Sequence, residues 1–375
     1  THCVREGDTV ARLGGDEFVV ILAGLSADVD NAAADTEAIA GKILFTVNEP
    51  YQLGGVAHHS SASIGVTLFN GEHSRIDDLM KQADLAMYKS KEAGRNALCF
   101  FDPHMESAVR ERAALEESLR QALAEKQFLL HYQAQVVDDG VLTGAEALVR
   151  WQQTTRGMTT LPGEFIPLAE ETGLILPLGR WVLETACRQL ADWSLRPEMA
   201  HLTIAVNVSA HQFRHPDFVA QVLGILDRTG ANPLRLKLEL TESLLVHNIE
   251  EVIAKMIALK ASGVSFSLDD FGTGYSSLAY LKRLPLDQLK IDQSFVNDVL
   301  SDPNDAVIAR AIVTLAQSLG MDVIAEGVET ASQRDFLASS GCRAYQGYFF
   351  SRPLPLDEFE TLAQQGRCRP QVEPA

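Results

Sequence analysis

The strongest constraint on the fold of this chain is the alternation of short apolar segments with amphipathic segments after residue 127. Strand-like segments recur there at residues 128–136, 142–151, 202–208, 234–240, 264–268, 288–291, 322–325 and 344–350. Helical patterns lie between most of them, at residues 178–193, 249–262, 306–319 and 332–339. Strands that alternate with helices over about 250 residues predict an α/β fold, a (β/α)8 TIM-like barrel.

The first two strand segments predict an irregularity in this barrel. Only the turn Asp138-Asp139-Gly140 joins them, and so short a turn cannot hold a crossover helix. We therefore expect these two strands to pair antiparallel, which makes this an irregular barrel with one antiparallel strand.

The first hundred residues show a different, α+β pattern. Residues 9–13 and 17–22 flank the Gly14-Gly15 turn and predict a hairpin. Residues 30–48 and 76–93 have helical periodicity, the second ending at Gly94, and residues 61–69 are strand-like. Residues 103–126 keep a helical period and predict a connecting helix.

Composition excludes several classes of partner and site. The net charge of −18 argues against binding to a DNA or RNA duplex. No apolar run approaches the roughly 18 residues of a membrane span, so this segment is expected to make no membrane contact. The five cysteines are odd in number and include no CxxC pair, which favours a reducing, cytoplasmic location over disulfides or a zinc site.

Polar side chains gather where the predicted strands end. In a barrel these ends converge on one face, so the side chains are expected to meet there. Each residue alone is explained as well by a salt bridge, a cap or a solvated turn, whereas the whole set predicts an oxygen-rich Mg²⁺ or Mn²⁺ site. The set comprises Glu146, Asn207, Glu239, Asp269, Asp270, Lys290, Asp292, Glu326 and Gln346.

This arrangement predicts phosphodiester chemistry. A carboxylate such as Asp269 can bridge two ions about 3.5–4 Å apart, which polarise a phosphodiester and activate water. Lys290 is expected to stay charged in this acidic cluster, and there it orients the water, stabilises developing charge or assists deprotonation. Arg150 shares a strand face with Glu146 and can reach a phosphate. Gly272 and Gly274 allow the loop after Asp270 to fold over a ligand.

The polar residues belong to an ordered set of motifs. These are Glu146-Ala147-Leu148-Val149-Arg150, Asn207-Val208-Ser209, Glu239-Leu240-Thr241-Glu242, Asp269-Asp270-Phe271-Gly272-Thr273-Gly274, Leu289-Lys290-Ile291-Asp292, Ala325-Glu326-Gly327-Val328-Glu329 and Gln346-Gly347-Tyr348. With these motifs, residues 124–367 resemble the EAL domains, a family of cyclic di-GMP phosphodiesterases that open the substrate to linear pGpG. One departure is that Ala134, rather than the family's usual Pro, follows Tyr132-Gln133, which affects no metal ligand.

The resemblance implies a role for each of these residues. It implies two ions per site, one held by Glu146, Asn207, Glu239 and Asp269, and the other by Asp269 and Asp270. It implies that Lys290 contacts the attacking water, supported by Glu326 and Asp292. Substrate contacts are implied for Gln133, Leu148, Arg150, Asp292 and Gln346. Loop support is implied for Glu242, Gly272, Gly274 and Glu329, and the family's loop couples metal binding to formation of a homodimer.

The first segment carries the motif Gly14-Gly15-Asp16-Glu17-Phe18 at its predicted hairpin turn. With this motif it is similar to GGDEF domains, which make cyclic di-GMP from two GTP molecules. The resemblance implies metal binding by Glu17 and GTP approach at Gly14 and Gly15. Lys91 and Arg95 match positions that contact GTP phosphates. Arg5 and Asp8 match the RxxD inhibitory product site, for which a surface salt bridge is the alternative.

We therefore expect four parts in this chain. They are a partial GGDEF domain at residues 1–101, a connecting helix at 102–124, an EAL phosphodiesterase domain at 125–368 and a tail at 369–375. The chain starts at Thr1, downstream of the family's first metal aspartate, so we expect further residues of the parent protein before it. The main hypothesis is a phosphodiesterase with a regulatory GGDEF domain. The alternatives are a silent cyclic di-GMP receptor and a bifunctional diguanylate cyclase in the parent protein.

Overall fold

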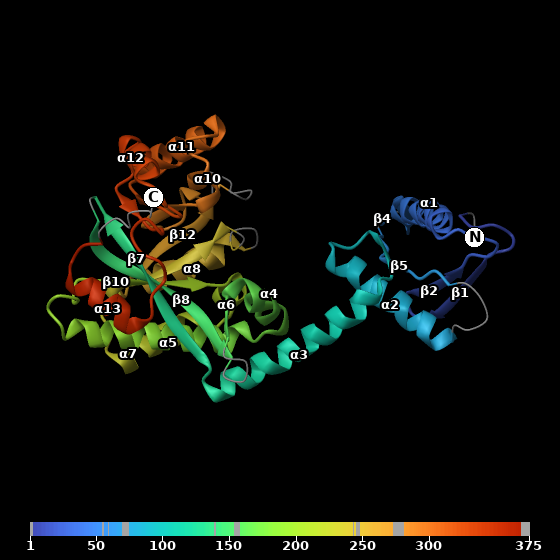
Figure 1. The fold of residues 1–375 in the computed structure, drawn as a ribbon, viewed down its shortest axis with the longest axis horizontal. Helices are drawn as coiled ribbons and strands as arrows, with labels where there is room; N and C mark the ends of the chain where they lie inside the picture. Colours follow the sequence, from blue (N-terminus) through green and yellow to red (C-terminus); the bar gives the residue numbers. More distant parts are fainter. Residues whose placement is uncertain are drawn as a thin grey trace. The chain divides into compact units, whose positions relative to one another are not determined.

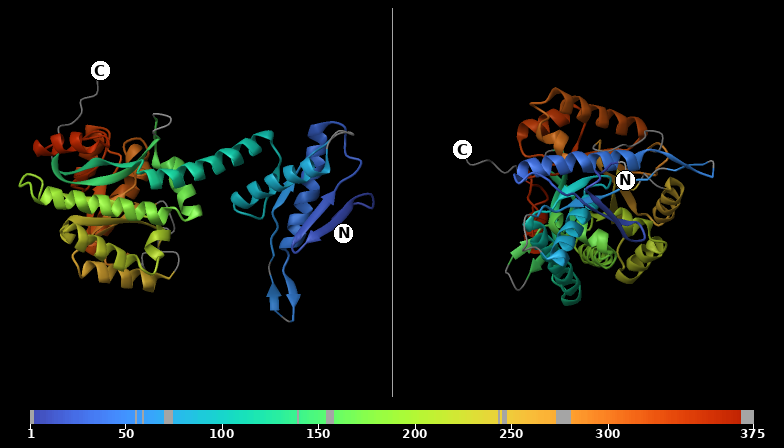
Figure 2. Two further views of the ribbon diagram at one scale, coloured as in Figure 1. Left: turned by 90° about the horizontal axis from the view of Figure 1, so that it is seen from below. Right: turned by 90° about the vertical axis from the view of Figure 1, so that its right-hand side faces the viewer.

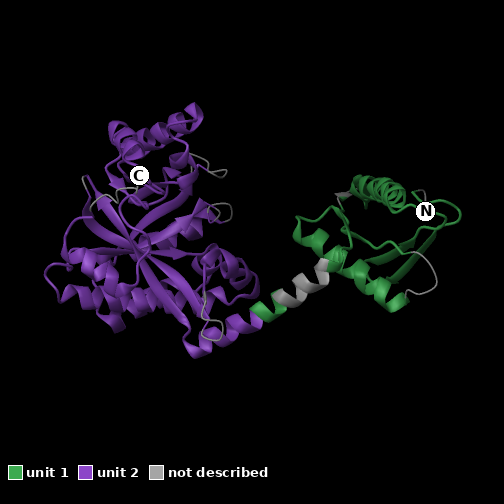
Figure 3. Cartoon of the chain, viewed as in Figure 1, with its two compact units in different colours: residues 1–115 green, residues 116–375 purple. Residues whose placement is uncertain are grey.

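The protein comprises two units, residues 1–115 and 116–375 (Figure 3). Their architecture comes from a computed structural model that describes residues 3–54, 56–58, 60–69, 75–138, 140–153, 158–242, 244, 248–272 and 281–368. The described helices include none that is both long and apolar enough to cross a bilayer.

Eight strands of the second unit close into a barrel, as the alternating pattern predicts (Figure 1). The order around the ring is β8, β10, β11, β12, β13, β14, β15 and β7, and β7 pairs back onto β8. The strands are β7 (Phe128–Val137), β8 (Val141–Gln153), β10 (Thr203–Val208), β11 (Leu236–Thr241), β12 (Ser265–Phe271), β13 (Gln288–Ile291), β14 (Asp322–Ala325) and β15 (Ala344–Tyr345).

Only one strand of the ring runs against the others. β7 pairs antiparallel with both of its neighbours, β8 and β15, while the remaining pairs are parallel. The predicted irregular barrel with one antiparallel strand is therefore confirmed. A short strand, β9 (Met158–Thr160), extends the sheet outside the ring by pairing with the end of β8.

Helices cover the outer face of this barrel, because each presents an apolar stripe to the strands (Figure 1). In α5, for example, Leu178, Val182 and Ala186 are buried at helical spacing. The helices are α4 (Pro162–Thr172), α5 (Ile175–Ser194), α6 (Ala210–Arg214), α7 (Phe218–Thr229), α8 (Ile249–Lys260), α10 (Gln293–Asn297), α11 (Pro303–Leu319), α12 (Ala331–Ser339) and α13 (Leu356–Gln364).

Two predicted barrel strands lack two or more residues at one end of their sequence pattern. The last ends at Tyr345 instead of residue 350, because the chain turns at Gly347, where the Phe350 N–H donates to the Gly347 carbonyl at 3.0 Å. A Cβ at Gly347 would lie 2.2 Å from the Val328 carbonyl oxygen, so only glycine fits this close approach. The fourth begins at Leu236, since Pro233–Arg235 form a 3-10 turn.

The first unit has the predicted hairpin and helices. β1 (Thr9–Gly14) and β2 (Glu17–Ile21) pair antiparallel, and β3 (Tyr51–Leu53) with β4 (Val56–His58) form a second antiparallel arm (Figure 2). The segment predicted as a strand at residues 61–69 forms only the short β5 (Ile64–Val66), which pairs in parallel with β6 (Leu98–Phe100). The helices are α1 (Val29–Asn48), α2 (Ile76–Glu92) and α3 (Pro103–Glu125), the last in the region predicted as a connecting helix.

Candidate functional site

The carboxyl ends of the parallel barrel strands hold the polar residues that the sequence analysis selected. Strand side chains alternate between the two faces of the sheet, so residues in register on neighbouring strands point to the same face. Asn207 on β10 is in register with Glu239 on β11, and Glu146 on β8 faces Gln133 on β7. Lys290 lies on β13, Asp269 and Asp270 on β12, and Asp292, Glu326 and Gln346 follow β13, β14 and β15.

Lys290 lies at the centre of this cluster. Its side chain is 1% exposed, and its Nζ lies 2.7 Å from Glu239 Oε2, 3.1 Å from Asp269 Oδ1 and 2.5 Å from Glu326 Oε1. Burial by itself would lower the pKa of Lys290, but the surrounding carboxylates, led by Glu146 and Glu239, raise this pKa well above its usual value. The ammonium therefore stays charged, as its acidic surroundings predict.

The carboxyl groups of the cluster crowd one another. Burial raises the pKa of Glu239 to about 8, opposed by Lys290 and reinforced by Glu146 and Asp269. Burial raises the pKa of Asp270 to about 6, with further contributions from the Asp269 and Asp292 carboxylates. The Lys290 ammonium thus balances this concentration of acid only in part, and such a site favours added positive charge.

Two side-chain amides hold Glu146. Asn207 Nδ2 donates to Glu146 Oε1 at 2.5 Å, and Gln346 Nε2 donates to Glu146 Oε2. A carboxylate only accepts hydrogen bonds, so the amide nitrogen of Asn207 must face Glu146. Its amide oxygen is consequently directed away from Glu146, where it can serve as a ligand for a cation.

A β-bulge explains how two consecutive residues reach the same site. Pairing between β12 and β13 shifts between Leu268 and Phe271, so Asp269 and Asp270 together oppose the single residue Lys290. Asp270 has a φ of 53°, which is unusual for a residue with a side chain, and its N–H donates to Asp269 Oδ1 at 3.0 Å. The bulge brings both carboxylates to the barrel mouth, where a regular strand would turn one of them away.

The donor set fits a hard divalent cation. It consists of carboxylate and amide oxygens, and Glu239 Oε1 is buried without a hydrogen-bond partner among the described residues. Among the described residues, no three or more His, Cys, Asp or Glu side chains are already arranged to hold a metal ion. In this structure the Lys290 ammonium contacts the carboxylates of Glu239 and Asp269. The unpartnered oxygen and the crowded charges are what a bound cation would satisfy.

Three of the five expected substrate contacts, Gln133, Leu148 and Arg150, lie on β7 and β8. Arg150 is buried, donates to the Val149 carbonyl at 2.9 Å and lies near enough to Glu146 for an electrostatic interaction. Burial lowers the pKa of Arg150, and Glu146 opposes this change. Leu148 lies between these two residues on the same strand face, and Gln133 donates to the Ser351 carbonyl at 3.2 Å.

The described part of the loop after β12 contacts Glu242. The Gly272 N–H donates to Glu242 Oε1 at 2.9 Å, and Gly272 has a φ of 101°, where a side chain would be strained. Gly274 lies outside the described residues, so its predicted role is untested. Glu329 is exposed before α12, and its N–H donates to Gln333 Oε1 at 2.9 Å.

In the first unit, Gly14 and Gly15 form the turn of the β1–β2 hairpin. Gly15 has a φ of 52°, its carbonyl accepts from the Arg12 guanidinium, and Glu17 begins β2 with an exposed side chain. Lys91 lies in the last turn of α2, and Arg95 follows that helix with a φ of 63°.

Arg5 and Asp8 form a local turn. Asp8 Oδ2 accepts the Arg5 N–H at 2.7 Å and Asp8 Oδ1 accepts the Ala23 N–H at 3.1 Å. This local structure gives Asp8 a structural role, and it leaves the inhibitory-site prediction untested.

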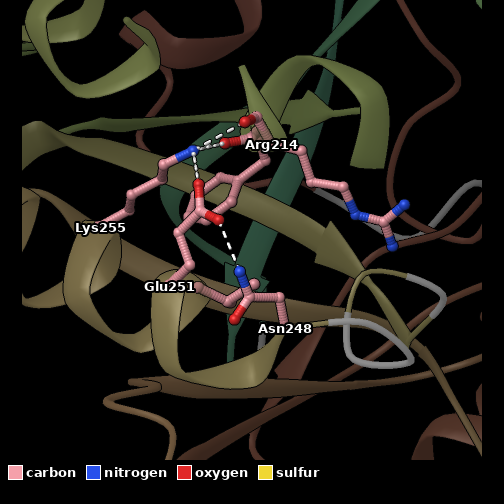
Figure 4. A pocket seen from close by; sticks show the side chains of 6 residues that line it. Arg214, Asn248, Glu251 and Lys255 are labelled. Carbon is pink, nitrogen blue, oxygen red and sulfur yellow. Dashed lines mark hydrogen bonds and ion pairs between the residues drawn. The ribbon is translucent and has the colours of Figure 1, made fainter. Parts of the chain in front are cut away.

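A small cavity lies between α6 and the start of α8 (Figure 4). Its volume is about 110 Å³, and Lys255 Nζ donates there to the carbonyls of Phe213, Arg214 and His215 at 2.9–3.1 Å. Lys255 also pairs with Glu251 at 2.9 Å. The lysine therefore caps the end of α6, a structural contact that the sequence analysis did not predict.

Comparison with known families assigns both parts of the sequence. Residues 116–353 match the family described as the EAL domain, and residues 1–97 match the family described as the diguanylate cyclase, GGDEF domain.

Two curated relatives from Pseudomonas aeruginosa are similar over nearly the whole chain. One, named bifunctional diguanylate cyclase/cyclic di-GMP phosphodiesterase MucR, is 44% identical over 95% of this chain and 51% of its own length. The other, named cyclic di-GMP phosphodiesterase NbdA, is 42% identical over 97% of this chain and 46% of its own length. The chain thus spans about half the length of these relatives.

A solved structure described as the PaMucR phosphodiesterase in complex with c-di-GMP resembles the barrel. It is 46% identical, with a TM-score of 0.63, and the match covers 66% of this chain and 99% of that one.

Proposed function

Since the chain belongs to the EAL domain family, we propose that its barrel is a metal-dependent phosphodiesterase that hydrolyses cyclic di-GMP to linear pGpG. The observation that carries this proposal is the convergence of Lys290 with Glu239, Asp269 and Glu326 at the carboxyl ends of the barrel strands. The names of the relatives and the cyclic di-GMP complex of a similar barrel support the substrate class.

We assign the metal ligands from the donor set of the cluster. Glu146, Asn207, Glu239 and Asp269 would hold one Mg²⁺ or Mn²⁺ ion, and Asp269 with Asp270 would hold a second. When bound, these ions polarise the scissile phosphodiester and lower the pKa of water. The unpartnered oxygen of Glu239 and the amide oxygen of Asn207 support this assignment.

The remaining residues bind the substrate and stabilise charge. Lys290 carries its proton firmly, so its ammonium donates hydrogen bonds to the attacking water or to phosphoryl oxygens and stabilises the charge that develops there. Water attacks phosphorus, the bond from phosphorus to the 3′ oxygen breaks, and the 3′ oxygen leaves with a proton. Arg150 binds a phosphate, and Gln133, Leu148 and Gln346 position the rest of the substrate.

A chromatographic assay tests this function. The purified chain is incubated with cyclic di-GMP and Mg²⁺ or Mn²⁺, with an EDTA control, and the nucleotides are separated. We expect pGpG to form and EDTA to block its formation. Binding of cyclic di-GMP with no cleavage would instead establish a receptor. Hydrolysis is favoured over a receptor because the sequence has each metal ligand that the resemblance implies, on the barrel strands β8, β10, β11 and β12.

For the first unit we propose regulation by GTP or product, because residues 1–97 match the GGDEF family. Deletion of this unit, or substitution of Arg5, is then expected to alter the kinetics of cyclic di-GMP hydrolysis, and unaltered kinetics would refute the proposal. A cyclase activity of the parent protein would consume GTP and be lost in Glu17→Ala.

We also propose a homodimer, which light scattering of the purified chain tests directly.

A further inference from the structure

Gln135 is a buried residue that the sequence analysis did not select. It lies two residues after Gln133 on β7, so both side chains point to the same face of the strand. Its side chain is 3% exposed. The β7–β8 register shifts directly after Gln135, and Thr143 Oγ1 donates to its carbonyl at 3.1 Å, so its backbone is fixed at a second bulge beside the site.

Hydrogen-bond chemistry fixes the orientation of the amides around Glu146. The carboxylate of Glu146 only accepts, so the atom of Gln346 that faces it must be the nitrogen, Nε2. The second Nε2 hydrogen of Gln346 goes to Gln133 Oε1 at 3.1 Å. Gln346 Oε1 therefore faces the other way, where Gln135 Nε2 donates to it at 3.0 Å.

Gln135 is thus the donor that stabilises this orientation of Gln346. Without it, the Gln346 oxygen would be buried with no donor, at a side chain that is only 4% exposed. A rotation of the amide by about 180° gives no relief, because it places the oxygen against the Glu146 carboxylate and Gln133 Oε1, and all three atoms are acceptors. The Gln346 amide would instead shift to bring its oxygen to another donor or to water, and this shift would weaken the bonds from Nε2 to Glu146 and to Gln133.

We propose that Gln135 is a positioning residue that, by orienting the Gln346 amide, holds the Glu146 carboxylate in its cation-binding position. This inference rests on the proposed function in one respect, the assignment of Glu146 as a metal ligand. Gln135 acts only through Gln346, which distinguishes it from residues that touch the substrate or an ion.

Binding of Mn²⁺, measured by electron paramagnetic resonance on the full chain, tests this role apart from turnover. The binding that Asp269→Ala removes defines the site, since the acidic surface binds further Mn²⁺. Gln135→Met keeps the size and shape of the side chain but removes the donor. We expect about tenfold weaker Mn²⁺ binding, which is the lower end of the roughly 10–100-fold loss of metal affinity that follows removal of a residue supporting a metal ligand.

Two further variants make the test specific. In Gln346→Met, the additional Gln135→Met change is expected to have no effect, because a residue that acts through Gln346 has nothing left to orient. Gln189→Met is the matched control, since it removes a buried amide contact, to Glu360 at 3.2 Å, on the outer helices of the barrel. The control is expected to bind Mn²⁺ as the unsubstituted chain does.

Three results would overturn the inference: unchanged Mn²⁺ affinity in Gln135→Met, additive losses in the double variant, or no Mn²⁺ binding at this site in the unsubstituted chain. If circular dichroism shows that Gln135→Met does not fold, Gln135→Asn replaces it, because its side chain is one methylene shorter and moves the donor away from Gln346. Its Mn²⁺ affinity is expected to fall in the same way, and an unchanged affinity would overturn the inference. If the chain forms pGpG but the losses of Mn²⁺ affinity in Gln135→Met and Gln346→Met are additive, only this inference is refuted. If the losses are not additive but the chain forms no pGpG, only the proposed hydrolysis is refuted.

Discussion

Replacement of Lys290 by Met should destabilise the metal-free barrel strongly. The ammonium is 1% exposed and contacts three acidic groups, so its removal leaves Glu239, Asp269 and Glu326 without a counter-charge. Breaking a buried ion pair from one side costs about 3–5 kcal/mol of unfolding free energy. A domain of this size loses about 2–4 °C of melting temperature per kcal/mol, so the melting temperature of the barrel should fall by roughly 6–20 °C.

Differential scanning calorimetry in EDTA measures this shift. Lys260→Met is the matched control, because Lys260 pairs with Asp287 at 2.5 Å where both side chains are about a third exposed, and such a pair contributes about 0–1 kcal/mol. Turnover of Lys290→Met should fall at least about 100-fold, since a group that stabilises developing charge is lost. A barrel transition within 2 °C of the unsubstituted chain, or turnover at its rate, would refute the reasoning.

Three further predictions concern the same barrel. Glu146→Ala and Asp269→Ala should each abolish pGpG formation in the chromatographic assay while the circular dichroism spectrum is kept, and unchanged turnover in both would contradict the assigned site. Saturating Mn²⁺ should raise the melting temperature of the unsubstituted chain, because a ligand of the native state stabilises it, but not that of Asp269→Ala; equal shifts would place the ion elsewhere. Gly347→Ala should lower the free energy of unfolding by at least about 2 kcal/mol, seen as a lower denaturation midpoint, since its Cβ would meet the Val328 carbonyl at 2.2 Å. Gly163→Ala, whose Cβ would meet nothing within 4 Å, is its control, and equal midpoints would refute the steric argument.

Local sequence pattern predicts most of the barrel because its strands and helices carry regular apolar periods. The limits of β13 and β14, Gln288–Ile291 and Asp322–Ala325, coincide with the predicted segments. The single antiparallel strand follows from one short turn. The early end of the last strand has a different cause, since it depends on the close approach of Gly347 to Val328, a contact distant in sequence.

The site is predictable as a set of residues but not as an arrangement. Strand ends identify the acidic residues and Lys290, because strand ends converge in any barrel. The bulge that brings Asp269 and Asp270 to one mouth depends on pairing with β13, which leaves no mark in the local pattern. The role of Gln135 also escapes, although its period-two spacing from Gln133 places it on the correct face.

The most direct test of the central claim measures whether oxygen from water enters the product when this chain is incubated with cyclic di-GMP and Mn²⁺ in ¹⁸O-labelled water. Hydrolysis at the barrel mouth predicts pGpG whose 5′-phosphate carries one ¹⁸O atom by mass spectrometry, and no such product from Asp269→Ala. Recovery of unlabelled, intact cyclic di-GMP from the unsubstituted chain would contradict the account.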